Sequence, residues 1–142
     1  MVEPQIRFRS DSPSTAPIVS FADFASDSNA AAVRIEPGDD ARALIAHIGQ
    51  LVLIEIAFPA FRDGRGYSSA RILREAGYTG ELRATGDVLV DQVPLMRRCG
   101  FDSLAPRSPL NEAVVAASLA RFDHVYQAAA DASVPVWKLR RG

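Results

Sequence analysis

The sequence predicts a single α/β domain of about four βα units with a mainly parallel sheet. Apolar, β-branched segments alternate with segments of helical periodicity, and the connections between them are short. The clearest strand, residues 51–57, is almost continuously apolar, which is typical of a central parallel strand covered on both faces. A chain of 142 residues fits one domain. A half-barrel and a small doubly wound sheet both satisfy this pattern.

The elements follow in order along the chain. Strands are expected at residues 32–35, 51–57, 81–85 and 101–104, with a last strand or ordered tail at 134–139. Asp39 or Asp40 can cap a first helix that ends near Gly49. Further helices are expected at residues 67–75, from 87 to 98, and from 111 to about 130. Pro94 must lie in a first turn or at a kink, so the third helix is expected to become regular near Asp91.

The first 30 residues are expected to form a tail and an edge segment, with the α/β domain proper at residues 31–142. Residues 1–16 have the composition of a mobile tail, and residues 18–24 are apolar enough for a short edge strand or a helical turn. A four-unit parallel sheet has two open edges. We therefore expect the N-terminal segment, or a second copy of the chain in a homodimer, to cover these edges.

Composition excludes several classes of function. A net charge of −1 favours neither nucleic acid nor an anionic membrane, and no apolar run is long enough to span a bilayer. Cys99 is the only cysteine, so no intrachain disulfide can form, and the chain fits a reducing compartment. The N-terminus lacks the pattern of a signal peptide, so a cytoplasmic location is expected.

The loop after the central strand is the main candidate for a functional site. Glycines flank an arginine there, and the amides at the start of the following helix attract anions. The expected oxyanion-binding residues are Arg62, Asp63, Gly64, Arg65, Gly66, Tyr67, Ser68 and Ser69. The glycines allow positive φ angles or close approach, and Ser68 or Ser69 can cap the helix or bind a ligand. The alternative is a salt-bridged turn in which Asp63 pairs with an arginine and Ser68 only caps.

A second cluster follows the strand at residues 81–85. Asp87 and Asp91 are the candidates for a catalytic acid or base, because a spacing of four places them on one side of a helix. In the alternative, Asp87 caps the helix and Asp91 pairs with Arg83 or a nearby arginine. Glu55 is interpreted either as an outward-facing or paired residue, or as an acid or base at the sheet mouth.

The remaining titratable residues are weaker candidates for a functional site. Arg71 and Arg74 are expected on a solvated helix face, and Cys99 is expected to be buried and unreactive. His47 and His124 lie far apart in the sequence, so no metal site is predicted. The chain lacks the third glycine of a dinucleotide fingerprint and the lysine of a phosphate loop, so no cofactor is predicted.

Three ordered blocks give the chain a family resemblance. These are residues 61–74, 77–92 and 96–102, which contain Gly77-Tyr78-Thr79-Gly80-Glu81 and Met96-Arg97-Arg98-Cys99-Gly100. They resemble bacterial domain-of-unknown-function family 934 over about residues 32–127. Members are often labelled as oxidoreductases involved in sulfite reduction, and that label rests on association.

The resemblance implies a role beside assimilatory sulfite reductase. The expected function is an accessory protein of sulfite reduction that recognises a small oxyanion or the reductase as partner. Two alternatives stay open. One is an oxidoreductase that works with a borrowed redox cofactor, since side chains alone do not transfer hydrides or several electrons. The other is a structural homodimer.

Overall fold

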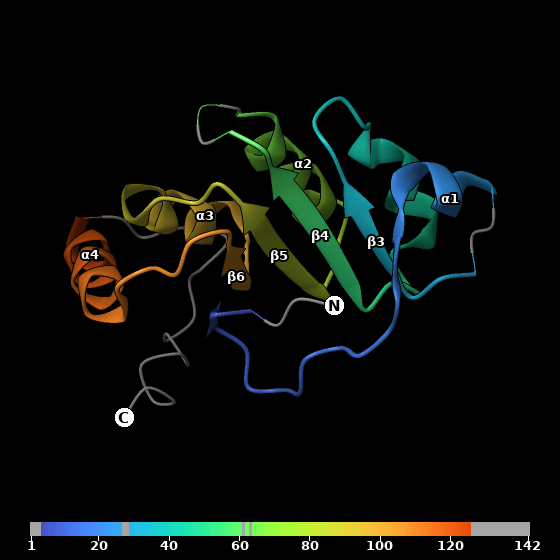
Figure 1. Ribbon diagram of the computed structural model, residues 1–142. Helices are drawn as coiled ribbons and strands as arrows, with labels where there is room; N and C mark the ends of the chain where they lie inside the picture. Colours follow the sequence, from blue (N-terminus) through green and yellow to red (C-terminus); the bar gives the residue numbers. More distant parts are fainter. Residues whose placement is uncertain (1–3, 27–28, 61, 63, 126–142) are drawn as a thin grey trace.

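The computed structural model describes residues 4–26, 29–60, 62 and 64–125, and within them a six-stranded sheet in the order β1-β6-β5-β4-β3-β2 (Figure 1). The strands are β1 (Ile6–Arg7), β2 (Ile18–Ser20), β3 (Ala32–Ile35), β4 (Leu53–Phe58), β5 (Glu81–Gly86) and β6 (Ser103–Pro106). β2 to β6 are parallel, and β1 pairs with β6 in the antiparallel direction. The predicted class, a single α/β fold with a mainly parallel sheet, is confirmed.

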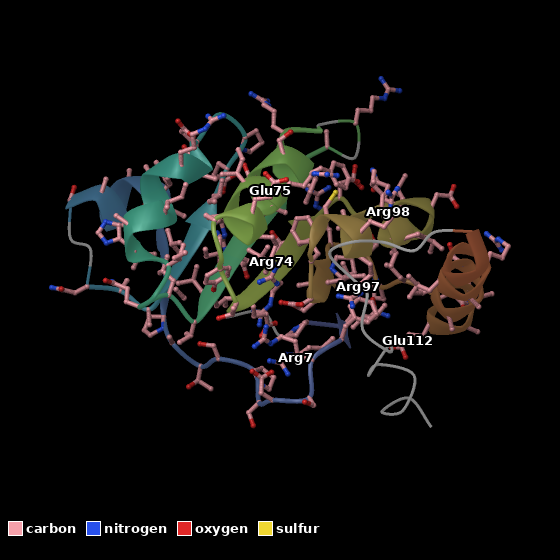
Figure 2. All side chains as sticks on the ribbon, turned by 180° about the vertical axis from the view of Figure 1, so that it is seen from behind. Arg7, Arg74, Glu75, Arg97, Arg98 and Glu112 are labelled. Atoms are coloured by element: carbon pink, nitrogen blue, oxygen red, sulfur yellow. The ribbon has the colours of Figure 1, made fainter. Side chains whose placement is uncertain are left out.

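The strand order selects the half-barrel type of winding. From β2 to β6 each crossover moves one place in the same direction, so the order never reverses. Right-handed crossovers that always advance in one direction place their helices on one face of the sheet. α2 and α3 accordingly lie behind the sheet in Figure 1 and in front of it in Figure 2. The sheet therefore has no switch point of the kind that makes a doubly wound crevice.

Helical elements follow the strands. They are α1 (Phe21–Ser26), η1 (Ala41–His47), α2 (Arg65–Glu75), η2 (Val90–Gln92), α3 (Val93–Cys99) and α4 (Glu112–Val125), where η denotes a 3₁₀ helix. Asp40 caps η1 by accepting from the Arg42 amide, as expected. Pro94 lies in the first turn of α3, where its missing N–H is tolerated. Among the described residues, no helix combines the length and the apolar character that crossing a membrane requires.

The two faces of the sheet differ in chemistry. Alternate strand residues such as Ile54, Ile56 and Leu82 join the main apolar core together with α2 and α3. The opposite face carries a register-aligned polar row across the strands. Arg34 of β3 faces Glu55 of β4, Glu55 faces Arg83 of β5, and Arg83 faces Ser103 of β6. The helices pack on the apolar face of the sheet, and charged side chains of neighbouring strands pair with one another on the other face.

The N-terminal segment differs from the expectation of a tail. β1 extends the sheet beyond β6, and Phe8 is buried, so residues 6–8 are part of the folded structure. At the opposite edge, β2 and α1 together realise the predicted edge strand and helical turn. The chain thus covers both edges of its four-strand parallel core with its own N-terminal segment. The expected continuation of the last helix to residue 130 and the segment 134–139 lie outside the described residues.

Candidate functional site

The loops that follow β3, β4, β5 and β6 gather at the carboxyl edge of the sheet. This is the edge at which parallel α/β folds bind their ligands. Asp87 follows β5, and its amide donates to the Phe58 carbonyl at the end of β4 at 2.7 Å. Arg107 follows β6, and its amide donates to the Gly86 carbonyl at 2.7 Å. These bonds tie the loops together, so the predicted motif and the predicted carboxylates share one edge.

α2 begins earlier than the sequence suggested. The helix starts at Arg65, and Gly64 occupies the N-cap position at φ −88° without a side-chain cap. The expectation of positive φ at Gly64 or Gly66 is therefore wrong, because Gly66 lies inside the first helical turn. The expectation that Ser68 or Ser69 caps the helix is wrong for the same reason. Gly64 has no side chain with which to cap the helix, and the Tyr67 amide donates to the Gly64 carbonyl at 3.2 Å.

Close approach explains the glycine at position 66. A Cβ placed there would lie 2.5 Å from the ring of Phe58, so no larger residue fits without displacing that ring. Phe58 also packs against Tyr67, with ring centroids 5.2 Å apart. β4 and the first turn of α2 are therefore held in fixed contact by an aromatic side chain.

A small open hollow lies beside the first turns of α2. Its lining residues are Ile35, Glu36, Pro37, Gly38, Ile56, Ala57, Arg65, Gly66 and Ser69. It has room for about one water molecule. The tip of Arg65 reaches the turn after β3, because its Nη1 lies 3.9 Å from where a Cβ of Gly38 would be. The hollow therefore joins the β3 turn to the predicted motif.

The predicted anion-binding residues do not all face this hollow. Arg65, Gly66 and Ser69 line it, whereas Arg62 and Ser68 are exposed on the surface outside its lining. Asp63 lies outside the described residues. The Tyr67 hydroxyl is buried without a hydrogen-bond partner among the described residues, and burial together with nearby Cys99 raises its pKa to about 12. Tyr67 therefore acts here as a packed aromatic.

The two candidate carboxylates are separated by the chain geometry. Asp87 lies in the turn after β5, and Asp91 lies exposed in η2, so the expected arrangement on one side of a helix is wrong. Arg83, one of the partners considered for Asp91, contacts Glu55 and Glu81 instead. Neither carboxylate lines the hollow.

Sequence reasoning missed three residues at this edge. Glu36 and Gly38 follow β3 and line the hollow, and exposed Arg107 follows β6 and donates to the Pro59 carbonyl at 3.4 Å. The signal was present, since each of the three follows a predicted strand.

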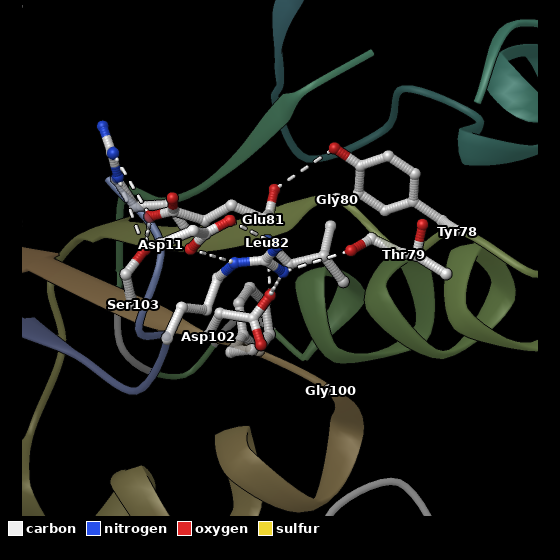
Figure 3. Close-up of polar contacts among 12 residues, drawn as sticks. Asp11, Tyr78, Thr79, Gly80, Glu81, Leu82, Gly100, Asp102 and Ser103 are labelled. Carbon is white, nitrogen blue, oxygen red and sulfur yellow. Dashed lines mark hydrogen bonds and ion pairs between the residues drawn. The ribbon is translucent and has the colours of Figure 1, made fainter. Parts of the chain in front are cut away.

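Asp102 anchors an arginine cluster at the opposite, amino edge of the sheet. Its carboxylate accepts from Arg9 at 3.1 Å, from Arg74, and from the Leu82 amide at 3.2 Å. Arg74 also donates to the carbonyls of Gly100, Tyr78 and Gly80. The expectation that Arg74 lies on a solvated helix face is therefore wrong. Figure 3 shows part of this network, which ties the end of α2 to the starts of β5 and β6.

Glu81 is the second anchor of the amino edge. It accepts from Arg7 of β1 at 2.8 Å, from the Ser103 hydroxyl at 2.6 Å and from Arg83 at 3.3 Å. Burial disfavours its charge, but the hydrogen bonds from Arg7 and Ser103 outweigh burial and lower the pKa of Glu81. Arg7 also binds Asp11, and the hydrogen bond from Arg9 lowers the pKa of Asp11 to about 2. Figure 2 shows Arg7, Arg74 and Arg97 on this side of the molecule.

Glu55 belongs to the polar row rather than to the carboxyl edge. It is 1% exposed, accepts from Arg34 at 2.8 Å and lies 3.7 Å from Arg83. One expectation, a paired residue, is confirmed, although Glu55 is buried and does not face outward. Two guanidinium groups compensate its charge, as a buried carboxylate requires.

Cys99 is buried, as expected, and burial raises the pKa of its thiol. His47 packs its ring edge-on against Phe24 at 5.2 Å. Within the described residues, no group of three or more His, Cys, Asp or Glu side chains is placed to hold a metal ion. Among the residues that line the hollow at the carboxyl edge are Glu36, Arg65 and Ser69, which bring a carboxylate, a guanidinium and a hydroxyl to this edge.

A family model described as bacterial protein of unknown function (DUF934) matches residues 32–137. The chain belongs to this family. The match covers β3 to α4, so it includes the hollow, Arg74 and Asp102 but not Arg7 and Arg9. Searches of curated proteins and of solved structures gave no match.

Proposed function

We propose that this DUF934 protein is a cytoplasmic accessory protein of assimilatory sulfite reduction that binds a small oxyanion at the carboxyl edge. The observation that supports the anion site most is that the first turn of α2 has no side-chain cap and lies beside a hollow lined by Arg65. Helix amides and a guanidinium are the groups that proteins use to bind oxyanions. The pathway is supported by the resemblance, whose family members carry a sulfite-reduction label.

The contrast between the two sheet edges supports the choice of site. At the amino edge, Arg7, Arg9 and Arg74 are engaged by carboxylates and carbonyl oxygens of the chain itself. Binding an anion there would require breaking ion pairs in the protein. At the carboxyl edge, Arg65 and Gly66 of the first turn of α2 line an open hollow.

Calorimetric titration with sulfite tests the anion site. We expect saturable binding by the full chain and a loss of about 1.5–3 kcal/mol in Arg65→Ala, because one charged hydrogen bond is removed. Arg121→Ala removes the same charge from an exposed position on α4 and serves as the control. Equal weakening in both variants would reject the site and leave only a general effect of charge.

Co-purification with assimilatory sulfite reductase tests the accessory role. We expect the purified reductase to retain the full chain on a column at low salt. The Arg121→Ala variant controls for nonspecific charge attraction. A reductase that retains no more of the chain than a blank column does would reject this partner.

A further inference from the structure

The N-terminal part of the chain lies along the outer edge of β6 as an added antiparallel strand. The Gln5 amide donates to the Leu104 carbonyl at 2.8 Å, and the Phe8 amide donates to the Asp102 carbonyl at 2.7 Å. Residues 5–9, here called the N-terminal strap, therefore occupy this edge in the way that a bound peptide adds a strand to a sheet.

Two arginines of the strap pair with carboxylates of the sheet. Arg7 lies 2.8 Å from the Glu81 carboxylate, and Arg9 lies 3.1 Å from the Asp102 carboxylate. Alternate residues of a strand point to the same side, so a spacing of two residues brings both guanidinium groups to this edge. The two carboxylates thus match the spacing of positive charges in an extended segment.

The other contacts of the strap are also specific. Phe8 lies between the two arginines, is buried in the main apolar core, and has the Arg97 guanidinium 4.4 Å from the centre of its ring. The Gln5 side chain donates to the Leu110 carbonyl at 2.7 Å and accepts from the Leu110 amide at 2.8 Å. The edge therefore contacts the side chains of the strap as well as its backbone.

Both carboxylates keep partners of their own when the strap is removed from consideration. Glu81 also accepts from the Ser103 hydroxyl at 2.6 Å and from Arg83 at 3.3 Å, and Asp102 also accepts from Arg74. Departure of the strap therefore leaves neither carboxylate as an uncompensated buried charge, which would be strongly destabilising. The edge can stay formed while its occupant is exchanged.

The strap lies outside the part of the chain that the family model matches, and the edge lies inside it. The match begins at residue 32, so it includes Glu81 and Asp102. Residues 10–17 connect the strap to β2 at the opposite edge of the sheet. The strap is therefore a tethered segment that is attached to the matched domain.

From these contacts we propose that the β6 edge is a strand-addition site for an extended protein segment with the order arginine, aromatic residue, arginine. The strap holds the site until such a partner segment displaces it. The two carboxylates repel an acidic segment, and a segment without an aromatic residue leaves the position of Phe8 empty. The tether gives the strap a local concentration of about millimolar, so the strap competes with any free segment. This site is separate from the carboxyl edge and does not depend on the anion site.

The test uses a fluorescent synthetic peptide of residues 4–12, whose polarisation is measured during titration with the full chain. A chain that carries both Arg7→Ala and Arg9→Ala is expected to bind this peptide about tenfold or more tightly than wild type, because its own strap competes less. Arg42→Ala removes an exposed arginine of η1 and is expected to bind the peptide like wild type. Urea unfolding curves check that the variants fold.

A peptide with the same two alanine substitutions controls for recognition of the arginines. It is expected to bind the doubly substituted chain about tenfold or more weakly than the natural peptide does. The proposal is overturned if the natural peptide binds the doubly substituted chain no more tightly than wild type. It is also overturned if the two peptides bind equally well.

Amide hydrogen exchange in wild type gives an independent measurement that needs no variant. At saturating peptide the Phe8 amide is expected to lose its protection, because the strap has left the Asp102 carbonyl, while the Ile56 amide in β4 keeps its protection. A Phe8 amide that stays protected would overturn the proposal, even if the doubly substituted chain does not fold. None of these results bears on the anion site at the carboxyl edge.

Discussion

At the scale of single residues, the same residue type plays different parts according to the edge at which it lies. Arg74 donates to three carbonyl oxygens and to Asp102, so it holds α2 to the segments that precede β5 and β6. Arg65 lies exposed at the other edge, beside the hollow. Counting arginines in the sequence does not separate these roles, because the difference arises from contacts between distant segments.

Gly66 gives a prediction at the residue scale. Gly66→Ala is expected to destabilise the protein by about 1–3 kcal/mol, because its Cβ would lie 2.5 Å from the Phe58 ring in a packed core. Gly64→Ala is the matched control. It has negative φ and no atom within 4 Å of the new Cβ, so a change below about 1 kcal/mol is expected. Urea unfolding measures both; equal effects would show that the Phe58 contact does not constrain position 66.

At the scale of elements, side-chain ion pairs contribute more than backbone pairing to the attachment of β1 to the sheet. It has only two residues in register with β6, and a strand that short binds weakly by ladder bonds alone. Arg7 reaches Glu81, Arg9 reaches Asp102, and the Gln5 side chain donates to the Leu110 carbonyl at 2.7 Å. These contacts hold the N-terminal strand to β5, β6 and the approach to α4.

Asp102→Asn tests how much the contacts of the N-terminal segment contribute to stability. The variant leaves Arg9 and Arg74 without their shared carboxylate, and a loss of about 3 kcal/mol in unfolding free energy is expected. Asp40→Asn makes the same chemical change at an exposed pair with Arg42 and keeps a good helix cap. It should cost less than about 1 kcal/mol. A small effect at both positions in urea unfolding would mean that the amino-edge network contributes little to stability.

At the scale of the whole molecule, the sequence predicted the repeating βα order well but the site only in part. Strand patterns were clear because the buried strands carry apolar runs, and residues 32–35 matched β3 fully. The start of α2 was misplaced because Gly64 and Gly66 look like a loop. The packing of Gly66 against Phe58 explains why a glycine stands inside the first turn of the helix. β1 was missed because its partners, β6 and Glu81, lie more than half the chain away in sequence.

The amino-edge network also makes the free energy of unfolding depend on pH in the acidic range. The pKa of Glu81 is lowered in the folded state, so its contribution is present above the ordinary glutamate pKa, about 4.3. That contribution is lost as the pH falls through the lowered value. The unfolding free energy of wild type should therefore fall between pH 5 and pH 3, and Glu81→Gln should fall less over this roughly two-unit range.

Glu75→Gln, which neutralises an exposed carboxylate at the end of α2, is the matched control for this acid series. Its pH dependence should follow that of wild type. If Glu81→Gln also follows wild type, Glu81 is not a source of the acid sensitivity.

The most direct test of the central claim is to locate a bound oxyanion by amide NMR shifts during titration of the full chain with phosphate. The account predicts saturable shifts at Gly38, Gly66 and Ser69 on the carboxyl edge, with little change at Gly80 and Gly100 beside Arg74. Saturable shifts centred on Gly80 and Gly100 would place the anion at the arginine cluster instead and contradict the account.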